Sequence, residues 1–117
     1  MIGQLRAVAI DCPQPRALAE FYSRLLGLEI TYDEGDWVTI GGPGQPRVSF
    51  QQAPDLLPPQ WPDPQRPQQM HLDVTVDDIE AAEEQALALG ARRLPGEGEN
   101  WRVYADPVGH PFCLVWD

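Results

Sequence analysis

The chain contains two similar segments, one in each half, and this repeat limits the folds that it can adopt. In the first half a short alternating run, Val8–Asp11, precedes a helical segment that ends at Leu25–Leu28. In the second half Val74–Asp77 precedes a helical segment that ends at Ala88–Ala91. A repeat of this kind predicts one supersecondary unit that is built twice.

Each half is predicted to form a strand, a helix and three further strands. Strands are expected at 5–11, 29–32, 37–40 and 47–52 in the first half, and at 71–76, 91–94, 101–105 and 112–116 in the second. The first helix is expected to begin near Pro15 and to end at Gly27. In the second helix Asp77 is expected to cap the first turn, Glu80 to reach back to it, and Gly90 to end the run.

The two modules are expected to form one domain, because 117 residues suffice for a single core. Module one covers about residues 4–52 and module two about residues 68–117. Residues 53–67 between them hold six prolines and are predicted to be a linker. The predicted fold class is α+β, in which two βαβββ modules form a curved mixed sheet around a cleft, with the helices on the outer face.

Strand alternation places apolar side chains on one face of the predicted sheets and small or polar side chains on the other. The polar face could simply face water. The repeat places Trp37 and Trp101 on that face, however, and an exposed indole is costly without a pocket or a partner, which favours a cleft. The residues expected to bind a ligand there are Trp37, Ser49, Gln51, His71, Asp73, Trp101 and Cys113.

Two of these residues could carry chemistry. His71 is the candidate catalytic residue, since it could act as a general base with Asp73 two positions further on. It could equally be a strand histidine that hydrogen-bonds a neighbour. Cys113 could be a thiolate activated by His71 or a small buried apolar residue. Trp61, in the linker, could stack on a ligand or cover the core.

Charge and hydropathy exclude several classes of partner. Eight basic and eighteen acidic residues give a net charge of −10, which repels phosphate backbones and anionic membranes and attracts cations. No apolar run approaches the roughly 20 residues of a membrane helix, and the first residues do not resemble a signal peptide. Cys12 and Cys113 lie far apart and are expected to be reduced thiols. We therefore expect a cytoplasmic protein that binds neither nucleic acid nor membranes.

Three motifs resemble the vicinal oxygen chelate superfamily, which includes glyoxalase I, methylmalonyl-CoA epimerase, extradiol dioxygenases, fosfomycin-resistance enzymes and bleomycin-resistance proteins. The motifs are Ala19–Tyr22 followed by Leu25–Leu28, then His71–Val74, and finally Asp106–Phe112. Together with the duplication they cover nearly the whole chain. The small glyoxalase-like proteins are the most similar members. The resemblance implies the duplicated fold but no single activity, because this scaffold supports several unrelated chemistries.

In metal-dependent members of the superfamily four strands supply four ligands, typically His or Gln, Glu, His and Glu. Carried over to this chain, these positions fall on Leu5, Ser49, His71 and Cys113. Leu5 cannot bind a metal and Ser49 is a poor ligand for a divalent ion. The two that remain are fewer than the three protein ligands usual for catalytic zinc. We therefore expect no metal centre of the usual kind and no other cofactor.

The lost ligands, the acidity and the tryptophans together resemble the bleomycin-resistance proteins, which are acidic dimers that sequester a cationic antibiotic. The resemblance implies a homodimer that binds a small molecule, with a cationic ligand favoured by the charge. The alternative is a lyase, isomerase or dioxygenase-type enzyme that uses a divalent metal or His71 as acid and base. The sequence leaves open which of the two applies, and whether the modules pair within one chain or across a dimer.

Overall fold

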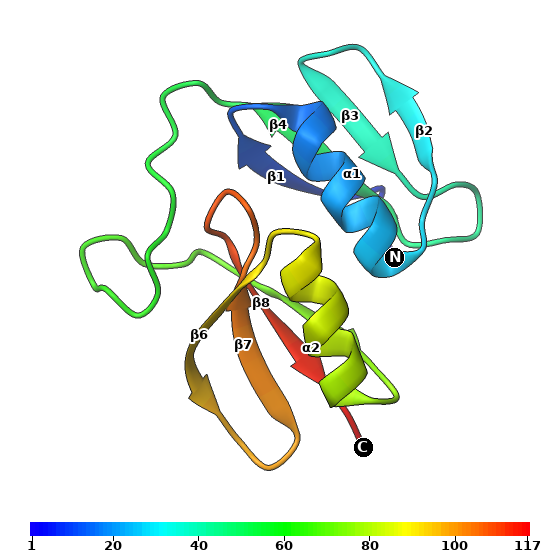
Figure 1. Ribbon diagram of the computed structural model, residues 1–117. Coiled ribbons are helices and arrows are strands. Elements are labelled where there is room, and N and C mark those ends of the chain that lie inside the picture. The colour runs from blue at the N-terminus through cyan, green and yellow to red at the C-terminus, as the bar shows by residue number, and fades with distance from the viewer. The chain divides into compact units, whose positions relative to one another are not determined.

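The computed structural model describes residues 1–117 and divides into two compact units, Met1–Leu56 and Leu57–Asp117. Each unit contains one helix and one four-stranded open mixed sheet. Figure 1 traces the chain through both units. The α+β class and the duplicated βαβββ module are therefore confirmed. None of the helices is both long enough and apolar enough to cross a membrane.

The first unit has the element order that the repeat predicts. Its elements are β1 (Val8–Cys12), α1 (Pro15–Leu26), β2 (Ile30–Asp33), β3 (Trp37–Ile40) and β4 (Val48–Gln52). The strand order in the sheet is β1-β4-β3-β2. Strand β1 runs parallel to β4 and the other pairs are antiparallel.

The second unit repeats this arrangement. Its elements are β5 (Leu72–Thr75), α2 (Ile79–Ala88), β6 (Arg92–Glu97), β7 (Trp101–Ala105) and β8 (Pro111–Val115). The strand order is β5-β8-β7-β6, with β5 parallel to β8. The expected strand at 91–94 is longer than predicted and extends to Glu97.

Strand pairing shows that the two modules correspond residue by residue. Ala9 pairs with Ser49 in the first sheet, as Asp73 pairs with Cys113 in the second. Trp101 opens β7 opposite Val115, just as the tryptophan at the start of β3 lies opposite Gln51. The match of Trp37 with Trp101 found in the sequence is thus also a match of backbone register.

Helix α1 covers the apolar face of the first sheet. Leu18, Phe21 and Tyr22 recur at helical spacing and are buried. The Tyr22 ring stacks on Phe50 of β4 with ring centroids 5.6 Å apart. Gly27 ends the helix in the left-handed conformation, with φ at 68°, which glycine adopts without the steric penalty of a Cβ.

Helix α2 begins one residue later than the sequence suggests. Asp78, rather than Asp77, is the N-cap, and its carboxylate accepts hydrogen bonds from the backbone N–H groups of Glu80 and Ala81. The Glu80 side chain does not complete a capping box. It pairs instead with Arg102 of β7 at 2.9 Å, so the expected reciprocal bond is replaced by a contact between helix and sheet.

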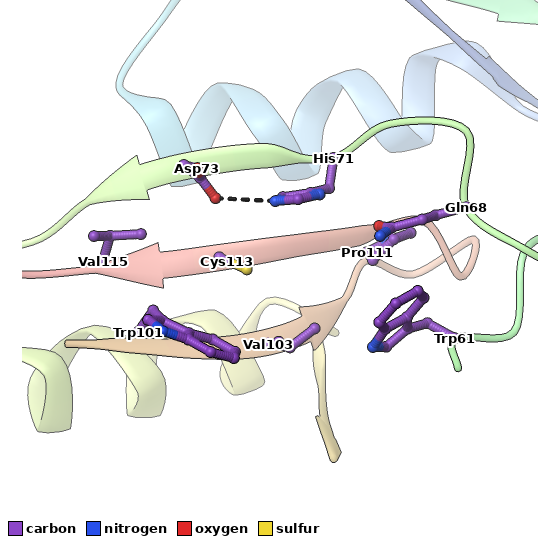
Figure 2. A pocket seen from close by; sticks show the side chains of 9 residues that line it. All are labelled: Trp61, Gln68, His71, Asp73, Trp101, Val103, Pro111, Cys113 and Val115. Atoms are coloured by element: carbon purple, nitrogen blue, oxygen red, sulfur yellow. Dashed lines mark ion pairs between the residues drawn. The ribbon is translucent and has the colours of Figure 1, made fainter. Parts of the chain in front are cut away.

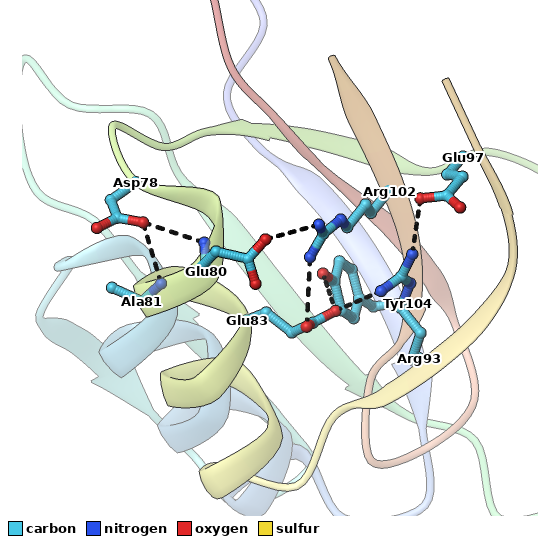
Figure 3. Close-up of polar contacts among 8 residues, drawn as sticks. All are labelled: Asp78, Glu80, Ala81, Glu83, Arg93, Glu97, Arg102 and Tyr104. Atoms are coloured by element: carbon cyan, nitrogen blue, oxygen red, sulfur yellow. Dashed lines mark hydrogen bonds and ion pairs between the residues drawn. The ribbon is translucent and has the colours of Figure 1, made fainter. Parts of the chain in front are cut away.

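Helix α2 buries only one apolar residue, Ala86. Polar contacts also join this helix to its sheet. Glu83 accepts hydrogen bonds from Tyr104 at 2.8 Å and from Arg93 at 2.6 Å, and it lies 3.3 Å from Arg102 (Figure 3). These donors lower the pKa of the Glu83 carboxyl, with the Tyr104 hydrogen bond the largest cause. Burial, together with the Glu83 contact, raises the pKa of Tyr104 to about 12.

A buried aspartate organises the turn before β8. One carboxylate oxygen of Asp106 accepts hydrogen bonds from the backbone N–H groups of Val108 and Gly109 at 2.9 Å and of His110 at 3.1 Å. Asp106 is fully buried, so this carboxylate replaces its lost hydration with backbone donors. The motif at 106–112 therefore forms the turn that leads into β8.

Candidate ligand-binding pocket

A pocket with a volume of about 420 Å³ lies on the second unit. This volume is within the range of small-molecule sites in proteins. Figure 2 shows the side chains that line it, which are Trp61, Gln68, His71, Asp73, Trp101, Val103, Pro111, Cys113 and Val115.

Three neighbouring strands supply most of these residues. The lining residues of β7 and β8 alternate along each strand, so they share the sheet face opposite α2. Strand β5 adds Asp73, with His71 just before the strand begins. Trp61 and Gln68 come from the segment that precedes β5. The expectation that Trp101, His71 and Cys113 share one face is therefore correct.

The polar groups of the pocket form a compact cluster. The Nε2 atom of His71 lies 3.2 Å from Oδ1 of Asp73 (Figure 2), and Cys113 is the cross-strand partner of Asp73. One donor atom from each of the three residues lies within 4.8 Å of the others. Imidazole, carboxylate and thiol thus meet at one point of the pocket wall.

Cys113 is a neutral thiol in this arrangement. Burial raises the pKa of the Cys113 thiol, and the nearby Asp73 carboxylate raises it further. An activated cysteine needs the opposite shift. The idea that His71 makes Cys113 a reactive thiolate is therefore not supported, because Asp73 is the closer electrostatic influence.

The walls of the pocket combine indoles with one carboxylate. Trp61 and Trp101 are 37% and 39% exposed, so each indole leaves part of its surface open. A Cβ on Gly98 would overlap the Trp101 ring, so the missing side chain at Gly98 leaves room for the indole. No arginine or lysine lies in the wall. Such a surface favours flat ligands, and Asp73 favours positive charge on them.

A second pocket, of about 790 Å³, lies on the first unit. Trp37 and Ser49 are in its wall, together with Arg6 and Arg47. The hydroxyl of Ser49 is buried and lies 2.8 Å from that of Thr39.

The seven candidate ligand-binding residues are thus divided between the two units. Four of them meet in the pocket of the second unit, namely His71, Asp73, Trp101 and Cys113. Trp37 and Ser49 belong to the pocket of the first unit, and Gln51 is exposed and lines neither pocket. A single cleft shared by all seven stays a prediction.

At one of the four positions that correspond to ligands in metal-dependent relatives, strand pairing assigns a different residue from the one assigned by the sequence. His71 lies two residues before Asp73, and the residue two before its counterpart Ala9 is Ala7, not Leu5. Leu5 precedes β1 and is 85% exposed. Neither alanine nor leucine supplies a ligand, and Ser49 is engaged with Thr39. The four-ligand centre therefore does not fit this chain.

Several lining residues were not predicted from the sequence. Val103 follows Trp101 by two positions in β7, so strand alternation was a signal that could have found it. Gln68 and Pro111 had no such signal, because one lies in an irregular segment and the other at the end of a turn.

The duplicated βαβββ module is that of the vicinal oxygen chelate class. Within that class, the chain belongs to the Glyoxalase-like domain family, whose model matches residues 7–115. No curated protein matches the chain.

Solved structures show the same fold at low sequence identity. A glyoxalase/bleomycin resistance protein/dioxygenase family enzyme from Burkholderia phytofirmans PsJN has a TM-score of 0.76 at 16% identity, covering 97% of this chain and 98% of that one. The fosfomycin resistance protein FosX from Mesorhizobium loti has a TM-score of 0.72 at 15% identity, covering 98% and 92%. The corresponding FosX from Listeria monocytogenes has a TM-score of 0.73 at 14% identity, covering 100% and 95%. At these identities the likeness concerns the fold alone.

Proposed function

We propose that this protein binds a small planar organic cation in the pocket of its second module, without the metal centre usual in the superfamily. One observation carries the proposal: Trp61 and Trp101 leave indole surface open in the same pocket as the Asp73 carboxylate, and its wall has no arginine or lysine. An indole face attracts a cation through its quadrupole, at about 0.5–2 kcal/mol for each contact.

The charge of the whole chain supports the same ligand class. A net charge of −10 raises the local concentration of cations and speeds their association. The Asp73 side chain is two-thirds exposed, so a ligand cation can approach it from the pocket. His71 already contacts this carboxylate, and it would compete with the ligand most strongly when protonated.

Binding can be tested with proflavine, a flat three-ring cation, and with 2-naphthalenesulfonate, a flat anion. Isothermal titration calorimetry should detect proflavine at one site per chain and give much weaker binding of the anion. Trp101→Leu should weaken proflavine binding about 3- to 30-fold, which corresponds to the loss of one cation–π contact. Bleomycin is a larger cation to test in the same way.

The repeat supplies a matched control for this variant. Trp37 occupies the corresponding strand position in module one and is exposed to a similar degree, at 36% against 39%. Trp37→Leu should leave proflavine binding unchanged. Absence of binding by every cation tried, or an equal loss in both variants, would contradict the assignment of the site.

An enzyme that uses His71 as acid or base is the second candidate. The 3.2 Å contact with Asp73 favours it, because a carboxylate can orient an imidazole for proton transfer. If a reaction is found, His71→Ala should abolish turnover and Asp73→Asn should reduce it, while circular dichroism of both variants stays unchanged. Turnover that survives in His71→Ala would remove this candidate.

A further inference from the structure

We infer that the pocket of the first unit binds a small organic dianion with two carboxylate groups, through Arg6 and Arg47. Both arginines lie in the wall of this pocket, which has a volume of about 790 Å³, and no aspartate or glutamate lies there. A planar guanidinium pairs with a carboxylate through two parallel hydrogen bonds. Two arginines in one wall therefore suit a ligand with two such groups.

Neither of these arginines forms an ion pair within the chain, although acidic residues are abundant. Arg16, Arg93 and Arg102 are the arginines that contact carboxylates. Arg6 is exposed and Arg47 is half-buried. The net charge of −10 repels anions, so one positive charge in the pocket would attract an anion only weakly. Two unpaired arginines in one wall reverse the charge locally and favour a dianion.

A pair of hydroxyl groups supplies a further donor in the same wall. The side-chain oxygens of Thr39 and Ser49 lie 2.8 Å apart, and Ser49 is 2% exposed. One hydroxyl donates to the other, so this contact uses one of the two protons. The second proton can be donated to a carboxylate oxygen in the pocket. Trp37, at 36% exposure, adds an indole face against which a flat ring can pack.

The second module carries none of these donors at the corresponding positions. The hydroxyl pair is matched there by Val103 and Cys113, and Arg47 is matched by Pro111. The carboxylate of Asp73, in turn, is matched by an alanine in the first module. The two modules thus share strand order and pairing but present opposite charges to a ligand. The anion site is specific to the first module and does not depend on the proposed function.

Isophthalate, a flat ring with two carboxylates, is the probe. Calorimetry on the full chain without proflavine should detect its binding, and should give much weaker binding of benzoate, which has one carboxylate, and of inorganic phosphate. The single charge of 2-naphthalenesulfonate should also make it a weak ligand. Arg47→Gln should weaken isophthalate binding about 10-fold, because a charged hydrogen bond at a half-buried position is lost. Arg6→Gln, at an exposed position, should weaken it about 2- to 5-fold.

Arg24→Gln is the matched control. Arg24 lies in the last turn of α1 and outside the pocket wall, so this substitution removes the same charge and should leave isophthalate binding unchanged. Trp101→Leu should also leave it unchanged, and Arg47→Gln should leave proflavine binding unchanged. The two proposed sites can therefore fail separately.

The inference is wrong if isophthalate does not bind, or if benzoate or phosphate binds as tightly. It is also wrong if Arg24→Gln weakens binding as much as Arg47→Gln does, or if neither Arg6→Gln nor Arg47→Gln weakens it.

Discussion

Glu83 offers the sharpest test of how the second module is held together, because one carboxylate joins helix α2 to two strands. Glu83→Gln keeps the size of the side chain and removes its charge. The hydrogen bond from Tyr104 and the ion pair with Arg102 are largely shielded from water, and each should lose about 1 kcal/mol when the acceptor is no longer charged. The more exposed Arg93 pair adds about 0.2–1 kcal/mol.

The expected loss in the free energy of unfolding is therefore about 2–3 kcal/mol at pH 7. Glu80→Gln is the matched control, since Glu80 lies on the same helix and contacts the same Arg102. Its side chain is 73% exposed against 20% for Glu83, so its loss should stay below about 1 kcal/mol. Urea unfolding followed by circular dichroism measures both values.

The pH dependence gives an independent check. The folded state lowers the pKa of Glu83 from its ordinary value of 4.5. Its stabilising effect is thus fully present above pH 4.5 and is lost as the pH falls through the lowered pKa. The difference between the unaltered chain and Glu83→Gln should shrink over that acid range. Equal losses for the two glutamine variants, or a difference that stays constant with pH, would refute the reasoning.

Three other substitutions test separate features. Asp106→Ala leaves the backbone N–H groups of Val108 and His110 without their acceptor, while that of Gly109 keeps the backbone carbonyl of residue 106; it should lower the unfolding free energy by about 2–3 kcal/mol, measured by urea unfolding. Gly41→Ala places a Cβ against a backbone carbonyl at a φ of 93° and should lower the thermal midpoint clearly more than Gly44→Ala, where φ is 78° but the space is open. Gly98→Ala should displace the Trp101 indole and weaken proflavine binding without a matching loss of stability.

The sequence predicted the fold well because alternation and repetition are both local signals. The strands predicted at 37–40 and 101–105 coincide with β3 and β7 along their whole length. The second helix has Asp78 as its N-cap and not Asp77 as predicted, because neighbouring aspartates can both serve as caps.

The match of Leu5 with His71 differs from the match that strand pairing gives, and the difference has a specific physical cause. Aligning Val8–Asp11 with Val74–Asp77 slips the first strand by two residues relative to the observed pairing. A slip of two keeps every side chain on its original face, because the strand period is two, so the hydrophobic pattern gives no warning. Only the pairing of β1 with β4 reveals that Ala7 corresponds to His71.

The sequence predicted only some of the residues that line the pocket, for a different reason. His71, Asp73 and Cys113 follow from alternation in two strands, and their face was predicted correctly. Their close approach depends on strand pairing between residues far apart in the chain. Trp61 comes from a proline-rich segment without periodicity, so nothing in the sequence decided between a ligand contact and a core contact.

The most direct measurement of ligand binding in the second module uses the indole N–H signals of the four tryptophans. In a ¹⁵N-correlated NMR spectrum each indole gives one signal, assigned by single substitutions. Saturating proflavine should shift the signals of Trp61 and Trp101, which line the pocket, and leave that of Trp37 in place. A shift confined to Trp37, or no shift in any indole signal, would contradict the account.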